Sequence, residues 1–175
     1  MDIRRNQGFT LIEMVVATAV FAVVLSAIAG SYLSVLRLNE KSRTVRVVEQ
    51  NARFITEFLT REIRNGTIDF SAAGYNGSVP NNGMVTYLYL LNSTGARETL
   101  DFVGTNIRLT KGSASTNLSG SDVRVSNLVF YVYPSNQSSQ NTVGFSFKVT
   151  SNTTAQTPGR ESSVVIQSTV ATRDY

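Results

Sequence analysis

The chain has 175 residues and a formal net charge of +4, from 16 Lys and Arg against 12 Asp and Glu. It contains no Cys, His or Trp, which excludes disulfide frameworks, thiolate or imidazole metal ligands, and Ser–His or Cys–His nucleophile pairs. The length suits one domain with an appendage, and we expect a protein that is not an enzyme and holds no cofactor or metal.

The N-terminal part of the chain has the composition of a membrane anchor. Residues 1–8 are short, polar and basic, and Phe9 then opens an apolar run. The 23 uncharged residues from Met14 to Leu36 would form a helix of about 35 Å, enough to cross a hydrocarbon core of about 30 Å. Because Arg4 and Arg5 precede the run, we expect a single-pass helix over 9–36 with its N-terminus in the cytoplasm.

A cleaved secretory signal peptide is the competing interpretation. Ala27-Ile28-Ala29 could serve as its small-residue cleavage site. However, the apolar run continues past Ala29 to Leu36, and a carboxylate, Glu13, lies near its start. These two features favour a membrane anchor over a cleaved signal peptide. The alternative function is that of an adhesin or binding module, which would be secreted or held by an uncleaved anchor.

Glu13 is the one charged residue in the apolar run, so we expect it to have either an ionic partner or a functional role. A carboxylate at membrane depth costs about 2.5–3.5 kcal/mol. It could lie shallowly and reach the headgroups. If the chain were cut after Gly8, Phe9 would carry a free amine, and Glu13 would lie near the first helical turn. There it would offset the helix dipole, or pair with the amine of a neighbouring chain.

The segment Gly8-Phe9-Thr10-Leu11-Ile12-Glu13-Met14 resembles the prepilin signal of type IV pilins and type II secretion pseudopilins. The resemblance implies that a prepilin peptidase cuts after Gly8 and methylates the new amine at Phe9. It also implies that Glu13 is needed for methylation and for assembly with other pilin or pseudopilin subunits. Many pilins carry a helix-bending Pro further along, but here no Pro precedes Pro80, and Gly30-Ser31 could loosen the helix instead.

Residues 37–65 continue as an amphipathic helix. One apolar stripe recurs at spacings of three or four, at Val45, Val48, Ala52, Ile55, Leu59 and Ile63. Charges of opposite sign four residues apart occupy the other surface, at Glu49–Arg53, Arg53–Glu57 and Glu57–Arg61. We expect the helix to stop at Asn65, with Gly66 in a left-handed cap conformation.

Residues 66–175 form a polar head with strand periodicity. Forty of these residues are Ser, Thr or Asn, and apolar side chains alternate with polar ones, as at 143–150. We expect a connecting loop at 66–83, then five or six antiparallel strands over 84–175. We also expect a hairpin turn at 92–95, a bulge at Ser126-Asn127, and polar turns at 111–121 and 134–141. The predicted fold is α+β, a long N-terminal helix packed on an antiparallel β head.

The stem ending at Thr60-Arg61-Glu62-Ile63-Arg64-Asn65 and the Asn- and Ser-rich head are similar to the PilW and PulJ group of minor pilins and pseudopilins. This resemblance implies storage in the bacterial inner membrane, then a pilus or pseudopilus in the periplasm or at the cell surface. Its partners would be the membrane, the prepilin peptidase and other subunits, with no small-molecule substrate. DNA is a weaker candidate partner, since the seven basic residues of the head are scattered.

Overall fold

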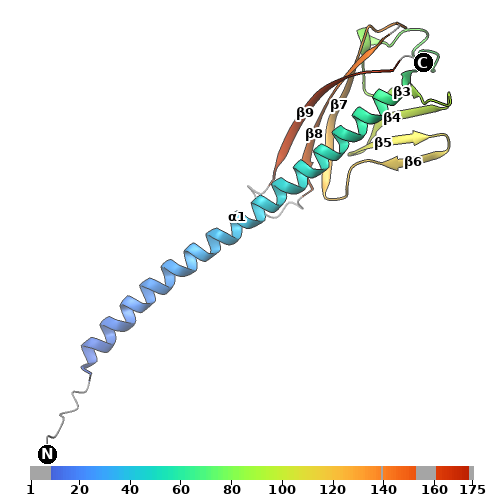
Figure 1. Cartoon of the computed structure of the whole chain (residues 1–175). Helices are drawn as coiled ribbons and strands as arrows, with labels where there is room; N and C mark the ends of the chain where they lie inside the picture. Colours follow the sequence, from blue (N-terminus) through green and yellow to red (C-terminus); the bar gives the residue numbers. More distant parts are fainter. Residues whose placement is uncertain (1–8, 139, 153–160, 174–175) are drawn as a thin grey trace, which may run out of the picture. The chain divides into compact units, whose positions relative to one another are not determined.

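The computed structural model describes residues 9–138, 140–152 and 161–173. It has an α+β, pilin-like architecture, in which one long helix, α1 (Leu11–Asn65), precedes antiparallel strands (Figure 1). This confirms the predicted fold class. The chain divides into two compact units, Met1–Lys41 and Ser42–Tyr175. In the first unit, α1 runs without a break through Gly30, and apart from its chain neighbours and the adjacent helix backbone nothing described comes within 4 Å of where a Cβ would lie at that residue.

In the second unit, the apolar stripe of α1 is buried against the strands. Its buried members are Val48, Ala52, Ile55, Leu59 and Ile63, which confirms the predicted helix face. The charged residues of the opposite surface, Glu49, Arg53, Glu57 and Arg61, are all exposed, as their position predicts, and no ion pair among the described residues joins them. Exposed pairs gain little from being held together. Arg61 instead lies over the ring of Phe58, 5.1 Å from its centroid.

The helix ends at Asn65 as predicted, but Gly66 serves a different purpose from the one expected. Its φ is not among the positive values found in the described residues. A Cβ at this position would lie 3.2 Å from the carbonyl oxygens of both Glu62 and Leu91, and 3.3 Å from the Cβ of Leu90. Gly66 is therefore required for the close passage of the chain between the helix end and the first sheet.

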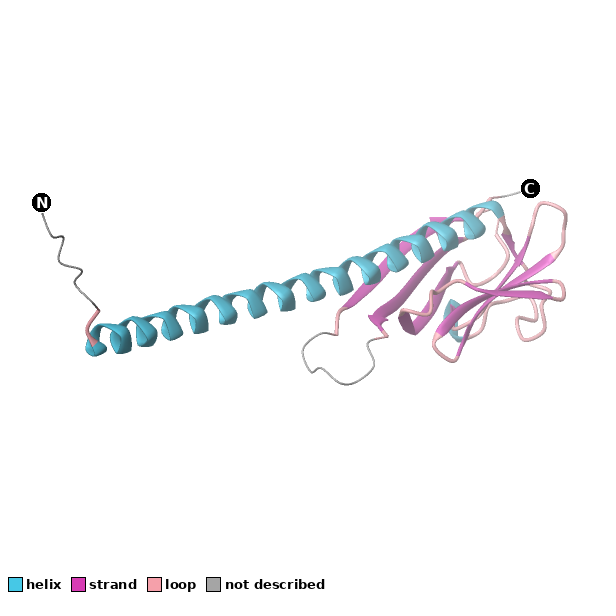
Figure 2. Ribbon diagram, turned by 90° about the horizontal axis from the view of Figure 1, so that it is seen from below, coloured by secondary structure: helices cyan, strands magenta, loops and turns pink. Residues whose placement is uncertain are grey.

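The described residues form nine strands in two sheets, more than the five or six predicted (Figure 2). The first sheet has the order β1-β3-β4-β5-β6, and the second β2-β7-β8-β9. The strands of the first are β1 (Thr67–Ile68), β3 (Leu88–Leu91), β4 (Arg97–Val103), β5 (Asn106–Lys111) and β6 (Ala114–Asn117). Those of the second are β2 (Met84–Val85), β7 (Val123–Tyr133), β8 (Thr142–Ser151) and β9 (Ser163–Ala171).

The extra strands are short, and they carry little periodicity. Strand β6 lies in the segment 111–121 that we predicted to be a polar turn, and β5 extends to Lys111. All four residues of β6 are exposed, so no apolar alternation marks them in the sequence. Strand β1 and a 3-10 turn, η1 (Asn81–Gly83), lie within segment 66–83. That segment contributes buried side chains to the core: Ile68, Phe70, Ala72, Tyr75 and Val79.

The bulge predicted in the longest strand is confirmed. The register of β7 against β8 shifts between Ser126 and Val129, so that two residues of β7 face Phe147. Asn127 takes a positive φ of 55° and is exposed, while Leu128 is buried. The extra residue therefore keeps both ends of β7 facing the core.

Candidate functional site

The helix begins with a cap built from the two polar residues of its first turn. The backbone N–H of Glu13 donates to the Thr10 hydroxyl at 3.3 Å, and the Thr10 hydroxyl donates to Glu13 Oε2 at 3.5 Å. This Thr-x-x-Glu spacing is typical of helix starts. It places the Glu13 carboxylate at the positive end of the helix dipole, where an anion is favoured.

Of the three residues predicted to function in processing and assembly, Gly8 lies outside the described residues. Phe9 directly precedes the cap residue Thr10 and is 80% exposed. Glu13 is also exposed and lies in the first turn of α1. The helix start thus brings Phe9 and Glu13 to one end of α1. Thr10 was missed by the sequence reasoning, although the Thr-x-x-Glu spacing is a recognised signal for it.

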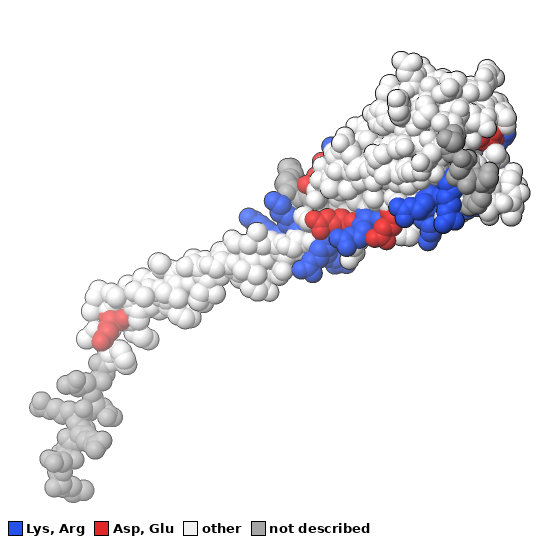
Figure 3. Space-filling view, turned by 45° about the horizontal axis from the view of Figure 1, so that its top comes forward, with Lys and Arg blue, Asp and Glu red and all other residues white. Residues whose placement is uncertain are grey.

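The segment that follows is apolar on all sides. Every residue from 9 to 43 is exposed, and one 18-residue window of α1 has a mean hydropathy of 2.5. By length and composition, α1 can therefore cross a membrane. Charged side chains are absent from residues 14–36 of α1 and gather along residues 37–65 (Figure 3).

The serine and threonine hydroxyls of the apolar segment form hydrogen bonds within the helix. Those of Ser26, Ser31 and Ser34 donate to the carbonyl oxygens four residues earlier, at 2.8, 3.0 and 3.0 Å. Thr18 does the same to Met14 at 3.0 Å. Because an unpaired polar group in hydrocarbon is costly, these bonds make the segment compatible with lipid.

The charged groups of the head serve to hold its elements together. Lys111 Nζ lies 3.3 Å from Glu62 of α1 and 3.0 Å from Glu98 of β4. Burial alone would lower the pKa of Lys111, but its bonds to Glu98 and Glu62 outweigh that effect and raise the pKa. The bonds therefore favour the protonated amine, which links α1 to β4.

A second charged contact, far apart in sequence, joins the start of the head to the hairpin of the first sheet. Asp69 is 1% exposed and accepts hydrogen bonds from Arg97 at 2.5 Å and from the Ser71 hydroxyl at 2.6 Å. Burial raises the pKa of Asp69, but the bonds from Ser71 and Arg97 outweigh it, so the net pKa is lowered. Among the described residues, no group of three or more His, Cys, Asp or Glu could hold a metal ion.

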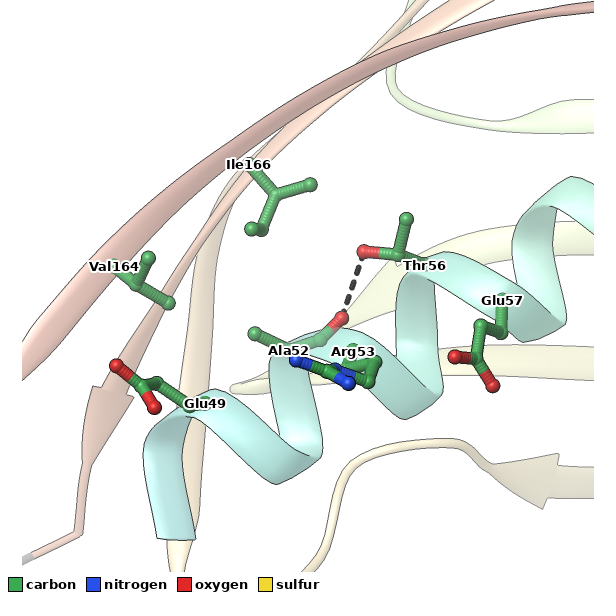
Figure 4. A pocket seen from close by; sticks show the side chains of 7 residues that line it. All are labelled: Glu49, Ala52, Arg53, Thr56, Glu57, Val164 and Ile166. Atoms are coloured by element: carbon green, nitrogen blue, oxygen red, sulfur yellow. Dashed lines mark hydrogen bonds between the residues drawn. The ribbon is translucent and has the colours of Figure 1, made fainter. Parts of the chain in front are cut away.

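A groove runs between α1 and β9 in the second unit. It encloses about 580 Å³ and is lined by Ala52, Thr56, Val164 and Ile166, with charges at its rim from Glu49, Arg53 and Glu57 (Figure 4). Thr56 bonds its own helix, since its hydroxyl donates to the Ala52 carbonyl oxygen at 2.7 Å. The groove therefore presents an apolar floor with charged side chains at its rim.

A family model described as a prokaryotic N-terminal methylation motif matches residues 3–29. No curated protein and no solved structure matches the chain. The match supports a type IV prepilin-like protein and indicates pilin-like or pseudopilin processing and assembly. It also favours a structural rather than an enzymatic protein.

Proposed function

We propose that this chain is a structural subunit of a type IV pilus or a type II secretion filament, a minor pilin or pseudopilin of the PilW and PulJ group. One observation carries the proposal. The methylation motif covers 3–29, where α1 exposes all its described side chains, whereas the second unit encloses a core of its own. An apolar segment of that size needs lipid or neighbouring helices to cover it.

We infer the following organisation. Residues 1–8 are a leader, 9–36 the membrane and assembly helix, and 37–65 the amphipathic helix of the head. Residues 66–83 connect this helix to the strands of 84–175. The chain is held in the bacterial inner membrane with its N-terminus in the cytoplasm, and it then enters the filament through its N-terminal helix. The prepilin peptidase and other pilin or pseudopilin subunits are its partners.

Cleavage after Gly8 would create the positive partner that Glu13 needs. The new amine of Phe9 would lie next to the N-terminal end of α1, where the helix dipole disfavours a positive charge. Glu13 would offset this charge in its own chain, or pair with the Phe9 amine of a neighbour. The Thr10 hydroxyl contacts Glu13 at 3.5 Å, so the carboxylate keeps acceptor capacity for a further donor.

Mass spectrometry of the protein extracted from its native membrane tests this proposal. We expect chains that begin at Phe9 and carry an N-methyl group. Gly8→Phe should leave the precursor uncut, while Gln7→Ala, one residue earlier, should be cut normally. Chains that begin at Gly30, or that retain Met1 in the wild type, would instead favour a secreted or anchored binding module.

A further inference from the structure

The outermost strand of the second sheet, β9, has one open edge. It pairs with β8 on one side, and it is the last strand in the sheet order. The other strands at sheet edges are short: β1 and β2 have two residues each and β6 has four, while β9 has nine. Within the described part of the chain, β9 is therefore the long strand with an unpaired side.

Two backbone hydrogen bonds at the ends of β9 show which of its N–H and C=O groups point toward β8 and which point away from it. The N–H of Ser151 donates to the carbonyl of Ser162, and the N–H of Thr172 to the carbonyl of Asn141, each at 2.9 Å. The register between them is continuous, and hydrogen-bonded pairs recur every second residue. Even-numbered residues of β9 thus bond to β8. The odd-numbered residues direct N–H and C=O outward; they are Ser163, Val165, Gln167, Thr169 and Ala171.

Within the described residues, these outward groups lack the usual protections of an exposed edge. Residues 163–171 include no Pro and no charged side chain, and their register with β8 has no bulge. In the described residues, no backbone hydrogen bond from another segment reaches the outward groups. The edge is therefore a ready template for one more strand, whose own backbone would satisfy these donors and acceptors.

The groove beside β9 would receive the side chains of such a strand. Val164 and Ile166 project from β9 toward α1 and form the apolar floor together with Ala52 (Figure 4). In an added strand, residues opposite Val164 and Ile166 would project to the same side. Since the groove encloses about 580 Å³, it has room for two apolar side chains at alternate positions.

We propose that the outer edge of β9 pairs with an extended strand of a different subunit in the same assembly, with apolar side chains at alternate positions entering this groove. The inference rests on the proposed function. Antiparallel pairing with a second β9 does not suit the edge. Strand β9 runs beside α1 in the same direction (Figure 1), so antiparallel β9–β9 pairing would place the two Ser42 residues at opposite ends of the joined sheet. Under the proposed function, both chains are anchored in one membrane by the residues before Ser42, which requires the two Ser42 residues to lie at the same end of a joined sheet.

Amide hydrogen exchange on the full chain tests the pairing directly. Exchange rates in native assemblies would be compared with those of separate chains in detergent. In the assembly, we expect the outward amides of Val165, Gln167 and Thr169 to exchange at least about tenfold more slowly. The inward amides of Val164 and Ile166 should be slow in both states, because β8 already protects them.

A matched pair of variants removes the outward donor alone. Gln167→Pro lacks the outward N–H yet leaves the β8 bonds of Ile166 and Ser168 in place, since Pro is tolerated at a sheet edge. Gln167→Ala removes the same side chain and keeps the N–H. We expect both variants to fold in detergent, and Gln167→Pro to enter the assembly at least about fivefold less than Gln167→Ala.

The outcomes separate this inference from the proposed function. Chains that begin at Phe9 and enter filaments, but whose outward amides exchange equally in both states, would overturn the strand pairing alone. Protection in detergent that grows with protein concentration would mean self-pairing and would also overturn it. Chains that are not cut at Gly8 and never enter filaments would overturn both proposals.

Discussion

Replacing Phe147 with Ala probes whether the second unit depends on a single packed core. Phe147 lies in β8 and is 0% exposed. Its ring stacks on that of Phe145, with centroids 6.1 Å apart. On the neighbouring strand β9, its register partner is Ile166. On the other neighbouring strand, β7, it lies opposite the bulge that brings Leu128 into the core. The side chain is therefore a buried member of the core, on a strand that is paired on both sides.

The expected loss follows from this burial. Truncating a fully buried Phe to Ala removes its transfer free energy and leaves a cavity, which together cost about 3–5 kcal/mol. A central strand fixed by neighbours on both sides has little freedom to collapse into the space, so we expect the upper half of this range. Val165→Ala, on the adjacent strand and 61% exposed, is the control and should change stability by no more than about 0.5 kcal/mol.

The assay is urea unfolding of residues 42–175, followed by circular dichroism. We expect this unit to unfold cooperatively without the apolar segment, because its core is internal to it. The midpoint should fall for Phe147→Ala with an unchanged denaturant slope. A loss below about 1 kcal/mol, or a non-cooperative wild-type transition, would refute the inference that one core joins the helix to both sheets.

Three further predictions concern the helix start, a turn and a buried charge. Glu13→Gln keeps the side-chain shape and removes the charge, so the variant should be cut after Gly8 and stay in the membrane but enter filaments poorly. Blots of the sheared and cell-bound fractions measure this, and equal incorporation of wild type and variant would show that the charge is not needed for assembly. Gly83→Ala places a Cβ 2.1 Å from the Val132 carbonyl oxygen at a residue whose φ is +90°. Gly77 has a similar φ but open space around it, so Gly77→Ala should lower the unfolding free energy of residues 42–175 by about 1–2 kcal/mol and Gly83→Ala by clearly more. Equal losses would count against the close packing at Val132. Because the folded state lowers the pKa of Asp69, its contribution to stability is complete above the unfolded value of about 3.9 and is lost as the pH falls below it. Urea titrations between pH 3 and 7 should therefore show a smaller acid loss in Asp69→Asn than in the wild type, and identical pH profiles would exclude this role.

The sequence by itself determined the features that depend on local periodicity. The stripe that includes Ile55 and Leu59, the helix end at Asn65 and the bulge after Ser126 all follow from spacings within a few residues. The same holds for the placement of Phe9 and Glu13 at one end of an apolar helix, because a helix start and an uncharged run are both local signals. These features also define the candidate site, which lies within a single stretch of the chain.

The tertiary structure decided how the strands divide and what holds them together. Strand β6 has no apolar alternation and exists because β5 offers it an edge. Asp69 meets Arg97 although 28 residues separate them, and Gly66 is needed for the approach of Leu91 rather than for a left-handed cap. The groove likewise depends on α1 and β9 lying side by side, although more than a hundred residues separate them, and the open edge of β9 depends on its place as the last strand of the second sheet. A pattern read along the chain carries no information about such distances, because the contacts form only when the core brings remote segments together.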